Sequence, residues 1–340
     1  MLYKVSLEEK LVFKILFDTN SICEKDFEIV CYKKLIKICS SQLIIPTLYS
    51  ILKKNKLNSF IPSDFHDYIK WIYEKNKERN NELIKEINFI SNVLNKNNIK
   101  HAFFKGASNL INKFYFNPGL RMIGDIDVLI SENDKLKVES ILVKEGYNNQ
   151  YNYLKWKTNV LKHFKSNNKI FALDVHTAIS KNKYIGFETN DLLKRSNKVN
   201  NISVLNIEDS KTIHIINFQI SDYGYLKSFY NYRVLYDIYG IKNNIKPKLL
   251  NEKIIKKFDE IFQHLKLSCQ DKNTFRINLL RSVIKKNYYF FSRFDNYICD
   301  YIIFIKDFPN KLLEFSFNKQ YRNHVLSKTK SAFINFFNKF

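Results

Sequence analysis

The sequence predicts an α+β protein in which a small mixed-sheet core is flanked by N-terminal and C-terminal helical regions. Three observations support this fold class. The 340 residues include only 7 glycines and 5 prolines, too few turn formers for an all-β chain. Short apolar runs alternate with helical stretches in residues 99–185, and helical periodicity dominates on both sides. We therefore expect three regions, 1–98, 99–185 and 186–340.

Residues 6–97 have the pattern of a helical region. Apolar side chains recur at close to helical spacing over 27–39, which places Cys31 and Cys39 in the expected core. A longer helical stretch follows Ser63, which we predict to be its N-cap. Residues 74–82 within this stretch are nearly all polar, so we expect that part to face solvent.

The central segment predicts the element order β-α-β-α-β-β. In chain order these are a strand over 99–104, a helix over 107–116, a strand over 125–130, a helix over 132–144 and a hairpin of 153–164 with 170–176. Gly146 stands where a C-cap glycine belongs after the second helix. Beyond about residue 186 the helical pattern returns, most clearly over 210–220, 226–241, 251–267 and 273–291.

Two aspartates separated by one residue form the centre of the expected site. On a strand, side chains at i and i+2 point to the same face, so the carboxylates of Asp125 and Asp127 converge. Asp174 adds a third carboxylate from the strand over 170–176, on the same face as His176. Carboxylates that lie close together repel unless a proton or a cation lies between them. Such oxygen ligands suit Mg²⁺, with Mn²⁺ as the alternative.

A phosphate-binding end is expected beside these carboxylates. Lys105, Gly106 and Ser108 lie at the start of a predicted helix, where free backbone N–H groups and the helix dipole attract anions. Glycine at this place permits a close approach of the backbone. Arg121 precedes the first aspartate by four residues and offers a planar fork to a triphosphate. We expect these four residues to bind an NTP.

These residues carry a resemblance to a known family. The stretch FKGASNLINKFYFNPGLRMIGDIDVLISENDKLKVESILVKEGY, Phe104–Tyr147, resembles an uncharacterised bacterial nucleotidyltransferase family with the hallmark LKG…Y…PG.R…DIDLLV…L…GY. Its later DLH strand is matched by 173–176, and Arg233 and Asp237 in YNYRVLYDIYG fit a further pattern. That family belongs to the DNA polymerase β-like nucleotidyltransferase superfamily. The resemblance is specific over residues 99–180 and looser in the flanking helices.

The resemblance implies an enzyme that moves a nucleoside monophosphate from an NTP to a hydroxyl of a small molecule, a sugar or a protein, with release of pyrophosphate. In the superfamily, three carboxylates hold two metal ions, one at the acceptor oxygen and one at the triphosphate. Carried over, Asp125 and Asp127 bind both ions, while Asp174 completes the catalytic metal site and helps deprotonate the acceptor. The superfamily glycine signal is Gly-Ser or Gly-Gly, whereas this chain has Gly-Ala-Ser from Gly106 to Ser108.

Two other functions remain open at this stage. Lysine and arginine outnumber aspartate and glutamate by 56 to 33, a net charge of +23 that attracts nucleic acids and anionic membranes. Template-independent nucleotide addition to RNA would use this charge, but the lysines are spread along the chain without a dense basic run or an RNA-binding module. A catalytically silent nucleotide-binding scaffold is the third hypothesis, and the presence of all three carboxylates argues against it.

The ends of the chain and its cysteines predict the compartment. The N-terminus lacks a signal-peptide apolar region, and no uncharged apolar stretch approaches the roughly 20 residues of a membrane span. The cysteines lack metal-ligand spacing, so we expect a cytoplasmic protein. A C-terminal helix with an aromatic face would contact a membrane peripherally or pack on its own domain, and its aromatic residues are Phe333, Phe336, Phe337 and Phe340.

Overall fold

The computed structural model describes residues 5–149, 162–166, 169–179, 187–222, 224, 230–240, 252–269 and, further on, 315, 316, 319, 322 and 326. The helix expected over 273–291 and the aromatic segment 331–340 lie outside these residues. The same holds for most of the strand expected over 153–164 and for the first part of the helix expected over 226–241.

The N-terminal region is helical, as predicted. Its elements are α1 (Leu7–Phe17), η1 (Thr19–Ser21), α2 (Lys25–Glu28), α3 (Tyr32–Ser41), α4 (Ile45–Lys54), η2 (Asn58–Phe60) and α5 (Ser63–Lys96). A capping box begins α1, because the Ser6 hydroxyl accepts from the Glu9 amide at 3.2 Å and the Glu9 carboxylate accepts from the Ser6 amide at 2.9 Å. These local signals fix where the first helix begins.

Two local predictions in this region are wrong. Pro62, not Ser63, occupies the N-cap of α5, and Ser63 is the first helical residue. Cys31 is exposed, whereas Cys39 is buried as expected. The reason is that α3 begins only at Tyr32, so Cys31 caps the helix and does not share its buried stripe.

The polar middle of α5 does not face solvent on all sides, contrary to the prediction. Asn76 and Asn80 are 5% and 0% exposed. The Asn76 amide donates to the carbonyls of Gly119 at 2.7 Å and Arg121 at 3.0 Å. The Asn80 amide donates to the carbonyls of Pro118 at 2.7 Å and Arg121 at 2.8 Å. These side chains hold the loop that leads into the central strand.

A mixed sheet confirms the α+β fold class. Its strands are β1 (His101–Phe103), β2 (Asp125–Ile130), β3 (Asn148–Asn149), β4 (Lys162–Lys165), β5 (Ala172–His176), β6 (Asn197–Val199) and β7 (Ile202–Val204). They lie in the order β3-β4-β5-β2-β1-β7-β6. The pairs β2–β5 and β1–β7 are parallel and the others are antiparallel. The predicted hairpin is thus present as β4–β5.

The segment after residue 186, expected to be helical, also contains a hairpin that joins the sheet. Asn200 and Asn201 connect β6 to β7 with φ values of 48° and 66°. Asparagine tolerates this left-handed conformation, which two-residue hairpin turns require. Beyond the hairpin the described residues are mostly helical, as predicted, and β7 pairs with β1 through Val204 and Phe103. The sheet therefore extends past residue 185.

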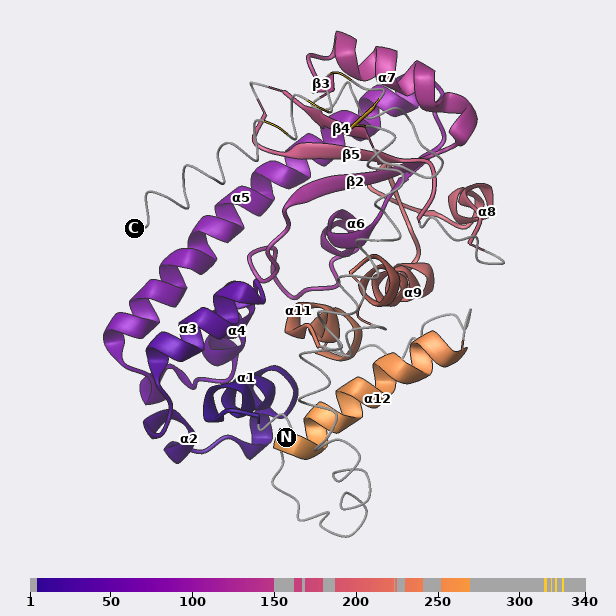
Figure 1. Cartoon of the computed structure of the whole chain (residues 1–340). Helices are drawn as coiled ribbons and strands as arrows, with labels where there is room; N and C mark the ends of the chain where they lie inside the picture. Colours follow the sequence, from indigo (N-terminus) through magenta and orange to yellow (C-terminus); the bar gives the residue numbers. More distant parts are fainter. Residues whose placement is uncertain are drawn as a thin grey trace.

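Of the remaining helices, some cover the two faces of the sheet and others pack against the N-terminal helices. These remaining helices are α6 (Lys105–Ile111), α7 (Lys135–Lys144) after the turn η3 (Glu132–Asp134), α8 (Thr189–Lys194), α9 (Ile207–Ile216), η4 (Asn217–Ser221), α11 (Tyr232–Leu235), η5 (Tyr236–Gly240) and α12 (Glu252–Cys269). Gly146, with φ of 82°, follows α7 as the predicted C-cap glycine. Figure 1 shows α5 running along the sheet, with α6, α9 and α11 below β2.

The strands alternate between two apolar cores. Ile126 and Val128 of β2 lie in the core formed with α5 and α7. Leu129 lies in the other core, together with Leu192 of α8 and Ile213 of α9. Successive side chains of a strand point to opposite faces. The odd-numbered residues of β2 therefore project toward α8 and α9.

Among the described helices, no single one is long and apolar enough to cross a membrane. Only α3 and α4 taken together, a pair bent by 116°, have the length and apolar composition of a membrane span among the described helices.

Candidate functional site

The three predicted carboxylates come together on β2 and β5. These neighbouring strands are parallel, with Asp127 opposite Asp174 and Asp125 opposite Ala172. Aligned residues of adjacent strands share a face, so all three aspartates project to the side of α8 and α9. Asp127 and Asp174 are each 3% exposed, and Asp125 is partly buried. Their convergence thus follows from one register between two strands.

Two basic side chains contact Asp127. The Lys105 ammonium donates to Asp127 Oδ1 at 2.6 Å, and His176 Nε2 lies 2.8 Å from the same oxygen. Burial would raise the pKa of Asp127, but Lys105 and His176 outweigh it and hold the pKa below its ordinary value. Lys105 reaches this position from the first residue of α6, with a left-handed φ of 53°. The predicted lysine therefore lies at the carboxylates.

The other two aspartates carry less compensated charge. Burial, and after it the negative charges of Asp127 and Asp174, raise the pKa of Asp125 to about 6. The imidazole Nδ1 of His163 on β4 contacts Asp174 Oδ1, and this hydrogen bond raises the pKa of His163. Such crowded carboxylates, with a raised pKa on one of them, are the electrostatic signature of a cation or proton site.

The donor set fits a divalent cation. Asp127, Asp174 and His176 each offer one ligand atom, and these atoms all lie within 4.8 Å of one another. Carboxylate oxygens suit Mg²⁺, and an added imidazole nitrogen is well suited to Mn²⁺ and other transition metals. His176 thus joins the two aspartates in the described cluster, while Asp125 lies beside it.

The glycine and serine of the expected phosphate cradle have packing roles in the structure. A Cβ on Gly106 would approach Arg121 Nη1 and Ile123 Cγ2 to 3.1 Å, so glycine lets α6 lie close to the chain before β2. The Ser108 side chain is fully buried. Its hydroxyl donates to the Leu205 carbonyl at 3.3 Å and lies 3.1 Å from the Ser210 hydroxyl. The structure does not bring this hydroxyl to the carboxylates.

Arg121 is engaged by a residue that the sequence did not pair with it. Its Nε and Nη2 donate to Asp237 Oδ2 at 2.9 and 2.7 Å, and the Tyr115 hydroxyl donates to Asp237 Oδ1 at 2.6 Å. Arg121 is 7% exposed. This bidentate pair ties the loop before β2 to η5. The guanidinium expected to meet a triphosphate is therefore occupied by a buried carboxylate.

Comparison with protein families decides the affiliation of the chain. The model of a family described as "Uncharacterised nucleotidyltransferase" matches residues 31–261, well over half of the sequence. The chain belongs to this nucleotidyltransferase family. The resemblance inferred from the hallmark residues is thereby confirmed, and the match also takes in the helical flanks. No curated protein matches the chain.

In this member of the family, Arg79 of α5 helps to position the strands of the candidate site. Its Nη2 donates to the Gly124 carbonyl at 3.1 Å and its Nη1 to the Ile123 carbonyl. The guanidinium lies 4.4 Å from the ring centroid of Phe171, directly before β5. Arg79 therefore links the points where β2 and β5 begin. No sequence pattern predicted this, because its partners lie more than 40 residues away.

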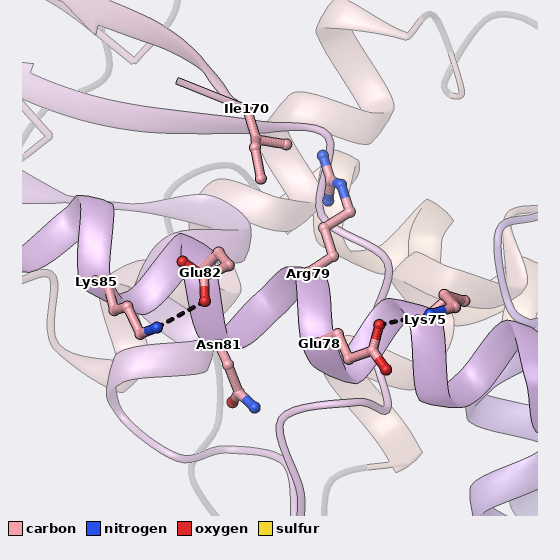
Figure 2. Close-up of a pocket in the computed structure, with 7 residues that line it drawn as sticks. All are labelled: Lys75, Glu78, Arg79, Asn81, Glu82, Lys85 and Ile170. Atoms are coloured by element: carbon pink, nitrogen blue, oxygen red, sulfur yellow. Dashed lines mark hydrogen bonds and ion pairs between the residues drawn. The ribbon is translucent and has the colours of Figure 1, made fainter. Parts of the chain in front are cut away.

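An open groove lies beside Arg79, between α5 and the chain before β5. Figure 2 shows it between Ile170 and the α5 residues from Lys75 to Lys85. Its lysines and glutamates pair on the same helix, Lys75 with Glu78 at 2.8 Å and Lys85 with Glu82 at 2.7 Å, while the Arg79 guanidinium donates to backbone carbonyls. The lysines and glutamates of the groove are thus engaged with one another.

Of the two histidines of the site, the sequence predicted only one. His176 was placed on the face of Asp174 by strand alternation, and it lies there. His163 was not predicted, although the expected hairpin contained the signal. In the antiparallel pairing of β4 with β5, His163 stands opposite Asp174. Its place opposite Asp174 depends on the register of β4 against β5, which the sequence pattern alone did not fix.

Proposed function

We propose that the protein transfers a nucleoside monophosphate from an NTP to a hydroxyl-bearing acceptor, a small molecule, a sugar or a protein, and releases pyrophosphate. The observation that carries the proposal is the parallel pairing that sets Asp127 against Asp174 with Asp125 beside them. The family match over residues 31–261 supports the same general reaction. Phosphoryl chemistry depends chiefly on positioning and charge neutralisation, which such a cluster supplies.

We propose Mg²⁺ or Mn²⁺ as the cofactor. Asp125 and Asp127 would hold both ions of a two-metal site, and Asp174, with His176 nearby, would hold the catalytic ion. When bound, the ions neutralise the triphosphate and lower the pKa of the acceptor hydroxyl. The raised pKa of Asp125, about 6, supports this proposal because a bound cation would offset the repulsion from Asp127 and Asp174.

The side chains would then act as follows. Asp174 accepts the proton of the acceptor hydroxyl, and the acceptor oxygen forms a bond to the α-phosphorus as the bond to pyrophosphate breaks. His163 contacts Asp174 and orients its carboxylate. Lys105, which neutralises Asp127 at 2.6 Å in this structure, can turn its ammonium toward the phosphates once a cation takes over that role. Lys105 thus offers one positive charge to the nucleotide.

Pyrophosphate release tests the proposal. The protein is incubated with each NTP, Mg²⁺ or Mn²⁺ and an acceptor pool from a cell lysate, and pyrophosphate is measured. Asp127→Asn should abolish release, while Asp67→Asn, which removes an exposed carboxylate on α5, should not change it. A wild-type rate in Asp127→Asn would refute the proposed site.

Measurements of RNA binding and of metal–NTP binding, made beside the pyrophosphate assay, separate the two alternatives. Salt-sensitive RNA binding with labelled RNA as the product would favour nucleotide addition to RNA. Binding of a metal–NTP complex without release of pyrophosphate under any acceptor condition would favour a silent scaffold.

A further inference from the structure

Arg233 has no direct partner for its charge among the described residues. It lies in α11, four residues before Asp237. Its Nε is buried without a hydrogen-bond partner, and the residue as a whole is partly exposed. A buried cationic N–H group without an acceptor is costly, so it points to an anion that the fold itself does not supply.

The nearby carboxylates do not fill this need. Asp237 is engaged by the Arg121 fork and by the Tyr115 hydroxyl. The charge of Asp222, at the end of η4, acts on Arg233, but the described residues contain no ion pair between these two side chains. Arg121 and Asp237 neutralise each other. Arg233 is therefore left without a direct ion pair among the described residues, although the charge of Asp222 acts on it.

Arg233 also lies near His214, where helices that adjoin the carboxylate site meet. Asn109 of α6 bonds to His214 of α9 at 3.0 Å, and His214 Nδ1 lies 4.0 Å from Asp237, so α6, α9 and η5 meet at this imidazole. Burial lowers the pKa of His214 to about 4. The positive charges of Arg121, Arg233 and Lys105 lower this pKa as well, whereas the negative charge of Asp237 raises it. Figure 1 shows α6, α9 and α11 close together below β2.

We propose that Arg233, together with Lys105, binds the phosphate groups of the nucleotide, the role that the sequence assigned to Arg121. This inference rests on the proposed function. Arg121 cannot fill the role without leaving a buried carboxylate unpaired. Arg233 offers a planar fork with unused donors, which suits bidentate phosphate recognition. Lys105 lies near the same place, because its neighbour Gly106 packs closely against Arg121, which binds Asp237 one turn after Arg233.

Calorimetric titration of the full chain with Mg²⁺–pyrophosphate and with Mg²⁺–ATP tests this inference. Arg233→Met should weaken the Kd of both probes about ten- to hundredfold, as expected for the loss of a charge-assisted bidentate contact. Arg233→Lys should show an intermediate loss, because it keeps the charge without the fork. Lys144→Met is the control, since it removes an exposed charge at the end of α7 and should leave both Kd values unchanged.

An unchanged Kd for Mg²⁺–pyrophosphate in Arg233→Met would overturn the inference while leaving the proposed function in place. If the wild type bound neither probe, both the inference about Arg233 and the proposed function would be wrong. The unfolding temperature of each variant is recorded alongside. Should the methionine variant fail to fold, Arg233→Lys decides by the same criterion, and wild-type affinity in that variant overturns the role of the fork.

Discussion

Asp125→Asn should stabilise the metal-free protein at neutral pH, although it removes a residue of the proposed site. In the folded protein, burial and the charges of Asp127 and Asp174 raise the pKa of Asp125 from 3.8 to about 6. A carboxyl with a raised folded-state pKa favours the folded state at low pH, and this contribution is lost as the pH rises through about 4 to 6. Above that window, the ionised Asp125 opposes folding.

The magnitude follows from the size of the shift. A shift of about two pKa units corresponds to roughly 3 kcal/mol in the free energy of unfolding. Because Asp125 is only partly buried, solvent screening reduces this value to about 1–2 kcal/mol. Asparagine has a similar shape and no charge, so the variant escapes this penalty.

Urea unfolding followed by circular dichroism in EDTA, at pH 4 and pH 7, measures the effect. We expect Asp125→Asn to exceed the wild type by about 1–2 kcal/mol at pH 7 and to match it at pH 4. Saturating Mg²⁺ should then stabilise the wild type more than the variant. Asp67→Asn controls for the lost charge. A variant less stable than the wild type at pH 7, or a difference independent of pH, would refute the reasoning.

Three further substitutions test the positions of other residues. Arg121→Met should lower the free energy of unfolding by about 3–5 kcal/mol, because it leaves Asp237 buried without its partner. A free energy of unfolding in urea within about 1 kcal/mol of the wild type would contradict the buried pair. Ser108→Ala should lower the free energy of unfolding by about 1–2 kcal/mol, because core hydrogen bonds are lost, and should leave the Kd of Mg²⁺–ATP unchanged. Weaker binding of Mg²⁺–ATP would instead support the role at the phosphates that the sequence predicted for Ser108. Gly106→Ala should cost about 1–3 kcal/mol by overpacking against Arg121 and Ile123, and a thermal unfolding curve like that of the wild type would show that α6 can shift.

The residues of the family hallmark divide into two groups in the structure. Lys105, Asp125 and Asp127 meet at the site, as the sequence predicted. Arg121 supports the scaffold, as does Gly119, where a Cβ would lie 2.7 Å from the Tyr73 ring. A hallmark gives the spacing of its residues but not which of them face the substrate. That distinction depended on partners such as Asp237, which lies 116 positions after Arg121.

The parts of the fold that could be predicted are those set by local periodicity. The strand expected over 125–130 matches β2 at both ends, because alternation of apolar and acidic side chains fixes its faces. The hairpin β6–β7 was missed because each strand has only three residues and its turn is Asn200–Asn201, without glycine. The buried face of α5 was missed for another reason. Asn80 is polar like its exposed neighbours, and its partners lie on a distant loop.

The fate of the phosphates of a labelled NTP tests the central claim most directly. The wild type, with Mg²⁺ or Mn²⁺ and the acceptor pool, is given ATP labelled at the α-phosphate or, in parallel, at the γ-phosphate, and the same is done for the other NTPs. The account predicts that the α-label enters the acceptor and the γ-label leaves in pyrophosphate, with neither product formed by Asp127→Asn. Transfer of the γ-label to the acceptor, or transfer of the α-label by Asp127→Asn at the wild-type rate, would contradict it.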